Sequence, residues 1–198
     1  MDRSETAATA GAGNDAPPFV ALRLPGAEAL NLRLRETLLA MAETMPDRGS
    51  NMPGGRSFFD NKWLSPSSLH REDVPAFQDI RTAIEAAANG AAVAGDRTPL
   101  RVVSMWSIVS RAEMEGRRHN HKGILSAAYY VDAGSSGADD GGLMQFYAEL
   151  GAAKPSHSVV PEAGLLVLFP SALQHAVSCY AGATPRIVIS ANLSVAES

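Results

Sequence analysis

Two histidines one residue apart, His119 and His121, stand in the segment EMEGRRHNHKGIL. Side chains of an extended chain alternate between its two faces, so both imidazoles would share one face and Asn120 would lie on the other. Two imidazoles on one face can bind a single metal ion. The same pattern also fits two polar residues on a solvated strand, so the pair alone leaves both interpretations open.

A third histidine, His175, follows two turn signals in the segment PEAGLLVLFPSALQHAV. A turn with Pro and Gly, an apolar strand and a second Pro turn would return the chain beside its earlier strands. His175 could then approach His119 and His121 as a third metal ligand. A lone histidine here would more often be a hydrogen-bonded core or surface residue, but the three together are harder to explain in that way.

Arg186 begins the last apolar segment, RIVISANLSV, which has one apolar face and one mostly polar face. On an ordinary sandwich strand the polar face would contact water. If helices cover the apolar face, Arg186 points instead into the mouth of a barrel, where its planar guanidinium could bind a carboxylate through two hydrogen bonds. The apolar face consists of Ile187, Ile189, Ala191 and Leu193. The mostly polar face consists of Arg186, Val188, Ser190 and Asn192.

Two amphipathic helices and a series of short strands must position these side chains. Apolar residues recur at helical spacing from Ala27 to Met45 and again from Val74 to Ala87. From Leu100 onward, short segments rich in β-branched and aromatic residues alternate with turn residues, and FVALRL near the N-terminus predicts another strand. We therefore predict a mainly β fold with flanking helices (α+β), in which the two helices pack outside an antiparallel sandwich or barrel.

Composition limits the other possibilities. Residues 1–17 have little to bury and predict a flexible tail, and residues 18–198, in a chain that is 45% apolar, predict a single domain. The 21 acidic and 17 basic residues include no basic block, so we expect no nucleic-acid partner. The single cysteine, Cys179, excludes an internal disulfide, and no apolar run is long enough for a membrane span or a signal peptide, so we expect a cytoplasmic protein.

The spacing of the histidines and the arginine, with Arg186 standing 11 residues after His175, resembles the double-stranded β-helix oxygenases that use ferrous iron and 2-oxoglutarate. The resemblance extends from about residue 18 to the C-terminus and is most specific in the last segment. Its motif positions are Ser50, Asn51, Gly54, Gly55 and Ser57, then His119, His121, Ser126, Tyr129, Tyr130 and Val131, then Pro161, Gly164, Leu168, Phe169, Pro170, Ser171, Leu173, His175, Val177, Arg186, Ile187 and Asn192.

The resemblance implies a double-stranded β-helix (jelly-roll, cupin-like) barrel with an iron(II) ion held by His119, His121 and His175. 2-Oxoglutarate would chelate the iron through its keto acid and place its distal carboxylate on Arg186, leaving one position for dioxygen. The expected reaction is hydroxylation of a small molecule or of an amino-acid or peptide substrate, with release of succinate and carbon dioxide.

The sequence departs from the family pattern at the metal site. The usual ligands are two histidines and one carboxylate, and His121 stands where the acid would be. His121 could be a third ligand or a neighbour that orients the site, and both interpretations remain open. Three acidic residues could complete the site but have no motif support, namely Glu115, Asp132 and Glu149.

A second departure affects the cosubstrate, because Val188 stands where many relatives carry a hydroxyl residue. The hydrogen bond to 2-oxoglutarate would then come from one of four residues, Ser190, Tyr129, Tyr130 or Ser126. Candidate substrate contacts are Asn51, Arg56, Trp106 and Gln145. Alternatively, Asn51 and Arg56 belong to a plain connection between a helix and a strand, and Trp106 is a core residue.

Two other functional classes are compatible with histidines on a small β-barrel. A cupin-type dioxygenase or isomerase without 2-oxoglutarate usually has a glutamate three or four residues after the histidine pair, where this chain has Ile124 and Leu125. A noncatalytic metal or small-molecule binding barrel would leave Arg186 without a role. A homodimer is the default expectation for the oligomeric state.

Overall fold

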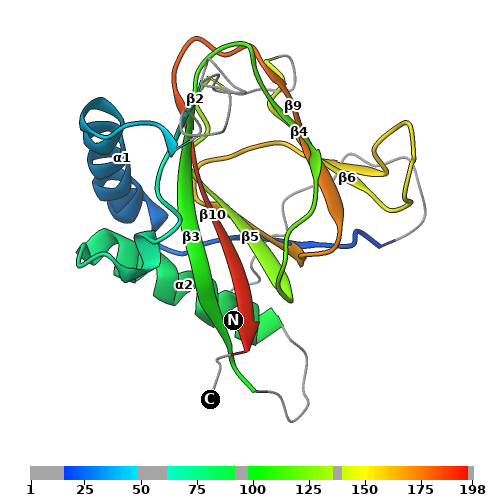
Figure 1. The fold of residues 1–198 in the computed structure, drawn as a ribbon, viewed down its shortest axis with the longest axis horizontal. Coiled ribbons are helices and arrows are strands. Elements are labelled where there is room, and N and C mark those ends of the chain that lie inside the picture. Colours follow the sequence, from blue (N-terminus) through cyan, green and yellow to red (C-terminus); the bar gives the residue numbers. More distant parts are fainter. Residues whose placement is uncertain (1–15, 49–61, 92–97, 136–139, 196–198) are drawn as a thin grey trace.

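Two antiparallel sheets face each other in the computed structural model, which describes residues 16–48, 62–91, 98–135 and 140–195 (Figure 1). The six-stranded sheet contains, in spatial order, β1 (Val20–Arg23), β8 (Leu165–Pro170), β5 (Leu125–Asp132), β10 (Arg186–Val195), β3 (Leu100–Ser110) and β2 (Lys62–Leu64). The four-stranded sheet contains β4 (Met114–His119), β9 (Gln174–Tyr180), β6 (Met144–Tyr147) and β7 (His157–Val159). The predicted mainly β fold is confirmed. In the described ranges, however, no ladder of backbone hydrogen bonds joins the two sheets, so the barrel is not closed.

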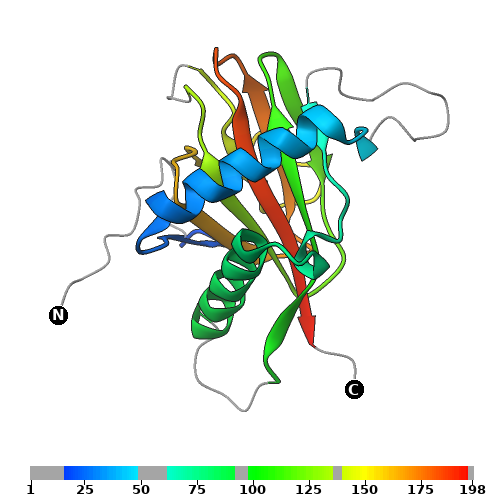
Figure 2. The ribbon, with the colours of Figure 1, turned by 90° about the vertical axis from the view of Figure 1, so that its left-hand side faces the viewer.

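Two helices cover the outer face of the six-stranded sheet, as Figures 1 and 2 show. Helix α1 (Ala27–Thr44) buries Leu34 and Leu38 from the predicted stripe. It ends at Thr44, and the next residue, Met45, is extended because the residue before a proline avoids helical backbone angles. A short 3-10 turn, η2 (Leu69–Arg71), precedes α2 (Pro75–Ala91), which begins at a proline whose missing N–H is not needed in the first turn. Neither helix is long and apolar enough to cross a membrane.

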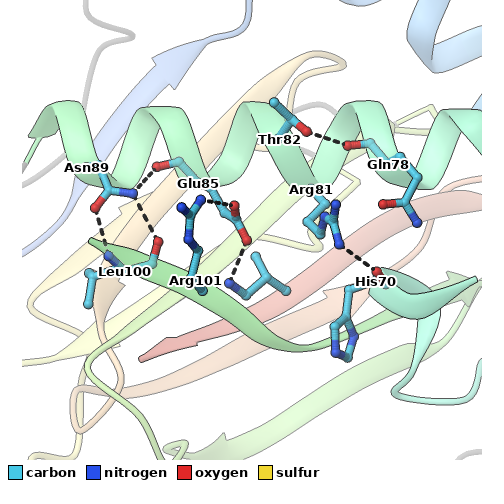
Figure 3. Close-up of polar contacts among 9 residues, drawn as sticks. His70, Gln78, Arg81, Thr82, Glu85, Asn89, Leu100 and Arg101 are labelled. Atoms are coloured by element: carbon cyan, nitrogen blue, oxygen red, sulfur yellow. Dashed lines mark hydrogen bonds and ion pairs between the residues drawn. The ribbon is translucent and has the colours of Figure 1, made fainter. Parts of the chain in front are cut away.

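Helix α2 is attached to the start of β3 by side chains that bind the strand's backbone (Figure 3). The amide of Asn89 accepts a hydrogen bond from Leu100 N at 2.8 Å and donates one to Leu100 O at 3.0 Å. Glu85 accepts from Val102 N at 3.0 Å and pairs with Arg101 at 3.0 Å. The edge of β3 in this stretch is therefore satisfied by the helix instead of by another strand.

Strand β10 separates the two hydrophobic cores as its alternation predicts. Its odd-numbered residues from Ile187 to Leu193 pack with the helices, whereas Val188 packs between the two sheets with residues such as Tyr130 and Phe146. Because helices cover the outer face, the polar residues of β10 face the inside of the sandwich. Arg186 and Ser190 accordingly line an internal cavity.

The sequence prediction omitted β2, which has only three residues, and β4, of which only Met114 is buried. The predicted tail, residues 1–17, lies almost entirely outside the described residues.

Candidate metal centre

The three predicted histidines meet at one end of the cavity between the sheets. His119 ends β4 and pairs across the ladder with His175 on β9. His121 follows β4, and its backbone N–H donates to Ser171 O at 2.9 Å. One ligand nitrogen from each imidazole lies within 4.8 Å of the others. Both histidines of the pair thus lie close to His175, with 4.3 Å between the ring centroids of His119 and His175 and 5.0 Å between those of His121 and His175.

Backbone carbonyls fix the orientation of two of the three rings. His119 Nδ1 lies 2.7 Å from Arg117 O, and His175 Nδ1 lies 3.0 Å from Leu173 O. A carbonyl can only accept, so in each ring Nδ1 carries the proton and Nε2 keeps its lone pair for a metal. His121 packs instead against the indole of Trp106, with 5.5 Å between ring centroids.

The electrostatics of the site favour neutral imidazoles, the form that binds metal. Burial, together with the smaller effect of the neighbouring His119, lowers the pKa of His121 to about 4. Burial also lowers the pKa of His175 to about 4 against the raising effect of its bond to Leu173 O. Both side chains are therefore unprotonated at neutral pH.

No carboxylate joins this cluster in the part of the chain that the structure describes. Asp132, an acid considered from the sequence, pairs with Arg35 on α1 at 2.8 Å. The donor set is three imidazole nitrogens, which suit iron as well as zinc, copper or nickel.

Arg186 lies in the same cavity, which has a volume of about 650 Å³. Its side chain is 2% exposed and extends to the other sheet, where Nη1 donates to Gly142 O at 2.6 Å. The guanidinium also stacks over Tyr180, 5.1 Å from the ring centroid, and burial lowers its pKa. Its Nε is buried without a hydrogen-bond partner, so the cation retains a donor for a ligand.

Ser110 is a functional candidate that the sequence did not reveal. It is the register partner of Arg186, lines the cavity and is fully buried. Its Oγ has no hydrogen-bond partner. The long-range pairing of β3 with β10 brings this hydroxyl beside Arg186, and nothing local in the sequence indicates that pairing.

The four hydroxyl candidates separate into two groups. Ser190 and Tyr130 line the cavity, and burial raises the pKa of Tyr130 to about 12. The prediction for Tyr129 does not fit, because its side chain faces the helices and donates to Asn31 Oδ1 at 2.6 Å. Ser126 does not line the cavity either, since its Oγ contacts Ser171 at 2.9 Å and Asn192 at 3.0 Å.

The predicted substrate residues also differ in whether they line the cavity. Trp106 lines the cavity beside His121. Gln145 does not, because Met144 and Phe146 take the inner face of β6 and Gln145 accepts from the Tyr147 hydroxyl at 3.4 Å. Asn51 and Arg56 lie outside the described residues.

Comparison with known proteins adds to this geometry. Residues 104–192 match the model of a family described as "Putative 2OG-Fe(II) oxygenase". A search of curated proteins finds no match.

The fold is that of several solved structures. A prolyl-4-hydroxylase from Pseudomonas putida superposes with a TM-score of 0.64 at 18% identity, covering 90% of this chain and 93% of that one. A Trichoplax adhaerens prolyl hydroxylase, solved with a hypoxia inducible factor peptide fragment, gives 0.69 at 10% identity, covering 90% and 84%. HygX from Streptomyces hygroscopicus, solved with nickel and 2-oxoglutarate, gives 0.63 at 14% identity, covering 89% and 82%. These likenesses establish a double-stranded β-helix.

Proposed function

We propose that this chain is a 2-oxoglutarate/Fe(II)-dependent oxygenase, as its family match over residues 104–192 supports, that His119, His121 and His175 hold the iron, and that Arg186 holds the distal carboxylate of 2-oxoglutarate. We propose in addition that the enzyme hydroxylates a small molecule or an amino-acid or peptide substrate. One observation supports this assignment above all: a cavity with three imidazoles at one place and a buried guanidinium with an unused N–H at another.

The residues at both ends fit the two expected groups. One ring nitrogen from each of the three imidazoles lies at the metal end, and imidazole is a suitable ligand for iron. At the other end Arg186 Nε and Ser110 Oγ are buried donors without partners, which a carboxylate would satisfy. Bound iron with 2-oxoglutarate would supply the activation of dioxygen, coupled to decarboxylation of the cosubstrate to succinate.

The chain's own residues then have separate roles. The carbonyls of Arg117 and Leu173 keep the proton of each ring on Nδ1, which aims Nε2 at the metal. Arg186 fixes the length of cosubstrate that can span the cavity. Trp106 closes one side of the metal end and limits the entry of water.

An anaerobic titration tests the proposal. Protein loaded with iron(II) should develop the weak visible absorption of chelated 2-oxoglutarate, and Arg186→Ala should lose this band while it keeps its iron. Bound iron without any band in the unaltered protein would refute the proposal.

The role of His121 is tested by counting iron per chain. His119→Ala, His121→Ala and His175→Ala should each lose most of the iron if all three are ligands. A His121→Ala protein with full iron would make His121 an orienting neighbour instead. His157→Ala serves as the control, because His157 lies on β7 outside the cluster.

A further inference from the structure

A row of hydrogen-bonded polar side chains crosses the six-stranded sheet over β5 and β10 to β3 (Figure 1). Ser126 Oγ donates to Asn192 Oδ1 at 3.0 Å, and Asn192 Nδ2 donates to Ser104 Oγ at 3.2 Å. Since Ser126 gives its only hydroxyl hydrogen to Asn192, Ser171 Oγ is the donor in its 2.9 Å contact with Ser126. Every bond in the row therefore points in one direction, from Ser171 toward Ser104.

The row begins at a residue that holds the backbone of the metal site. Ser171 follows β8, and its carbonyl oxygen accepts the backbone N–H of His121 at 2.9 Å. Both Ser126 and Ser171 are buried, and neither lines the cavity. These two serines therefore support the chain around His121 and do not meet a ligand in the cavity.

The row ends in the cavity, which both Asn192 and Ser104 line. Ser104 Oγ accepts from Asn192, and no group in the part of the chain that the structure describes accepts the Ser104 hydroxyl hydrogen. The Asn192 amide has a second Nδ2 hydrogen, because its bond to Ser104 uses only one. Since hydrogen bonds in a chain polarise one another, the last hydroxyl of the row should donate more strongly than that of an isolated serine.

These two donors lie at the metal end of the cavity, away from Arg186. Ser104 and Trp106 are two residues apart on β3 and share one face, and Trp106 packs against His121. Arg186 stands six residues before Asn192 on β10, which corresponds to roughly 20 Å of strand. A molecule bound at Ser104 and Asn192 therefore leaves Arg186 available to the cosubstrate.

We propose that Ser104 and Asn192 bind the substrate through an uncharged carbonyl group, such as that of an amide. A carbonyl oxygen has two lone pairs, so it can accept from the Ser104 hydroxyl and from the Asn192 amide at once. Both donors are neutral, so they offset the desolvation of an uncharged carbonyl better than that of an anion. The adjoining part of the substrate would pack on Trp106. This inference rests on the proposed function, because the carbonyl is taken to belong to the molecule that the oxygenase oxidises.

The test uses three probes that share a phenyl ring. Phenylacetamide carries an uncharged carbonyl, phenylacetate carries a carboxylate, and toluene has no hydrogen-bond acceptor. Each probe is titrated by calorimetry, without oxygen, into the full chain loaded with iron(II) and 2-oxoglutarate. Phenylacetamide should bind about fivefold more tightly than either of the other two. Binding of phenylacetate or toluene that equals or exceeds that of phenylacetamide overturns the proposal, as does a lack of phenylacetamide binding.

Substitutions at Ser104 locate the binding. Ser104→Ala should weaken phenylacetamide binding about fivefold and leave toluene binding unchanged, whereas Ser104→Thr, which keeps a hydroxyl, should retain the preference for the amide. Ser68→Ala is the control, because Ser68 bridges to the same strand at Met105 but does not line the cavity, and its hydroxyl donates to Glu72 at 3.3 Å. A preference that survives Ser104→Ala, or that Ser68→Ala removes equally, overturns the proposal.

The visible band of chelated 2-oxoglutarate, recorded in the same samples, separates this inference from the proposed function. If the band forms but phenylacetamide has no advantage, only the inference about the substrate is overturned. If the advantage exists and depends on Ser104 but the band is absent, the proposed function fails and the carbonyl-binding site remains.

Discussion

Ser110→Ala should weaken the binding of 2-oxoglutarate without destabilising the protein. Ser110 Oγ is buried, has no partner and lies beside Arg186, whose Nε is also unused. A hydrogen bond to a charged group is worth about 1.5–3 kcal/mol, so its loss should raise the Kd for 2-oxoglutarate roughly 10- to 150-fold. Since the hydroxyl is unsatisfied in the free protein, its removal should leave the free energy of unfolding unchanged or raise it by up to about 1 kcal/mol.

The matched control is Ser107→Ala on the same strand. Ser107 is equally buried, but its Oγ donates to Val188 O at 3.1 Å, so the substitution should lower the free energy of unfolding by about 1 kcal/mol and leave the Kd unchanged. Moving the hydroxyl with Val188→Ser in the Ser110→Ala protein should recover part of the affinity, because Val188 lines the cavity two residues from Arg186.

Calorimetric titration of the iron(II)-loaded proteins without oxygen gives the Kd, and urea unfolding of the metal-free proteins gives the stability. An unchanged Kd in Ser110→Ala would refute this reasoning. So would a loss of stability as large as that of Ser107→Ala, since the hydroxyl would then be bonded within the fold.

Three further predictions follow from local geometry. Gly142→Ala should weaken 2-oxoglutarate binding more than tenfold with iron retained, because the new Cβ would lie 2.2 Å from Arg186 Nη1 at a residue with φ of 69°; calorimetry with unchanged affinity would contradict this. Asn89→Ala should reduce the free energy of unfolding in urea by about 1–3 kcal/mol and leave the Kd for 2-oxoglutarate unchanged, because it removes the attachment of α2 to β3. The metal-free protein should lose stability between about pH 6.5 and pH 4, because the unfolded chain protonates His121 and His175 first; constant urea midpoints over this range would oppose the prediction.

The main elements of the site could be predicted from the sequence because they depend on local patterns. Alternation alone puts His119 and His121 on one face, and a strand between two turns returns His175 to them. Arg186 lies on the face of β10 opposite to the apolar residues, so its position in the cavity can be predicted once helices cover the apolar face. These predictions need only the direction of side chains along one strand.

The predicted site residues that lie away from the cavity belong to segments in which the sequence pattern does not indicate which way a side chain points. In LSAAYYVD of β5 both faces are buried, so Tyr129 and Tyr130 look equivalent in the sequence. The register with β10, which pairs Val188 with Tyr130 and shifts just before it, decides that Tyr130 faces the cavity. The position of Gln145 away from the cavity has a related reason, because β6 is too short for its polar residues to indicate which face is solvated.

Hydrogen-bond satisfaction differs between the buried polar residues on the two faces of the six-stranded sheet. On the helix side of the six-stranded sheet, the Tyr129 hydroxyl is bonded to Asn31, and Ser107 to a backbone carbonyl. On the cavity side, Ser110 Oγ and Arg186 Nε remain without partners, although both are buried. Buried polar groups without partners are destabilising, so a fold that retains two of them in one row of a cavity indicates a ligand that satisfies both. Position in the cavity is an essential part of this criterion, since other buried atoms that lack partners do not line it, namely His70 Nδ1, Arg81 Nε and Arg118 Nε.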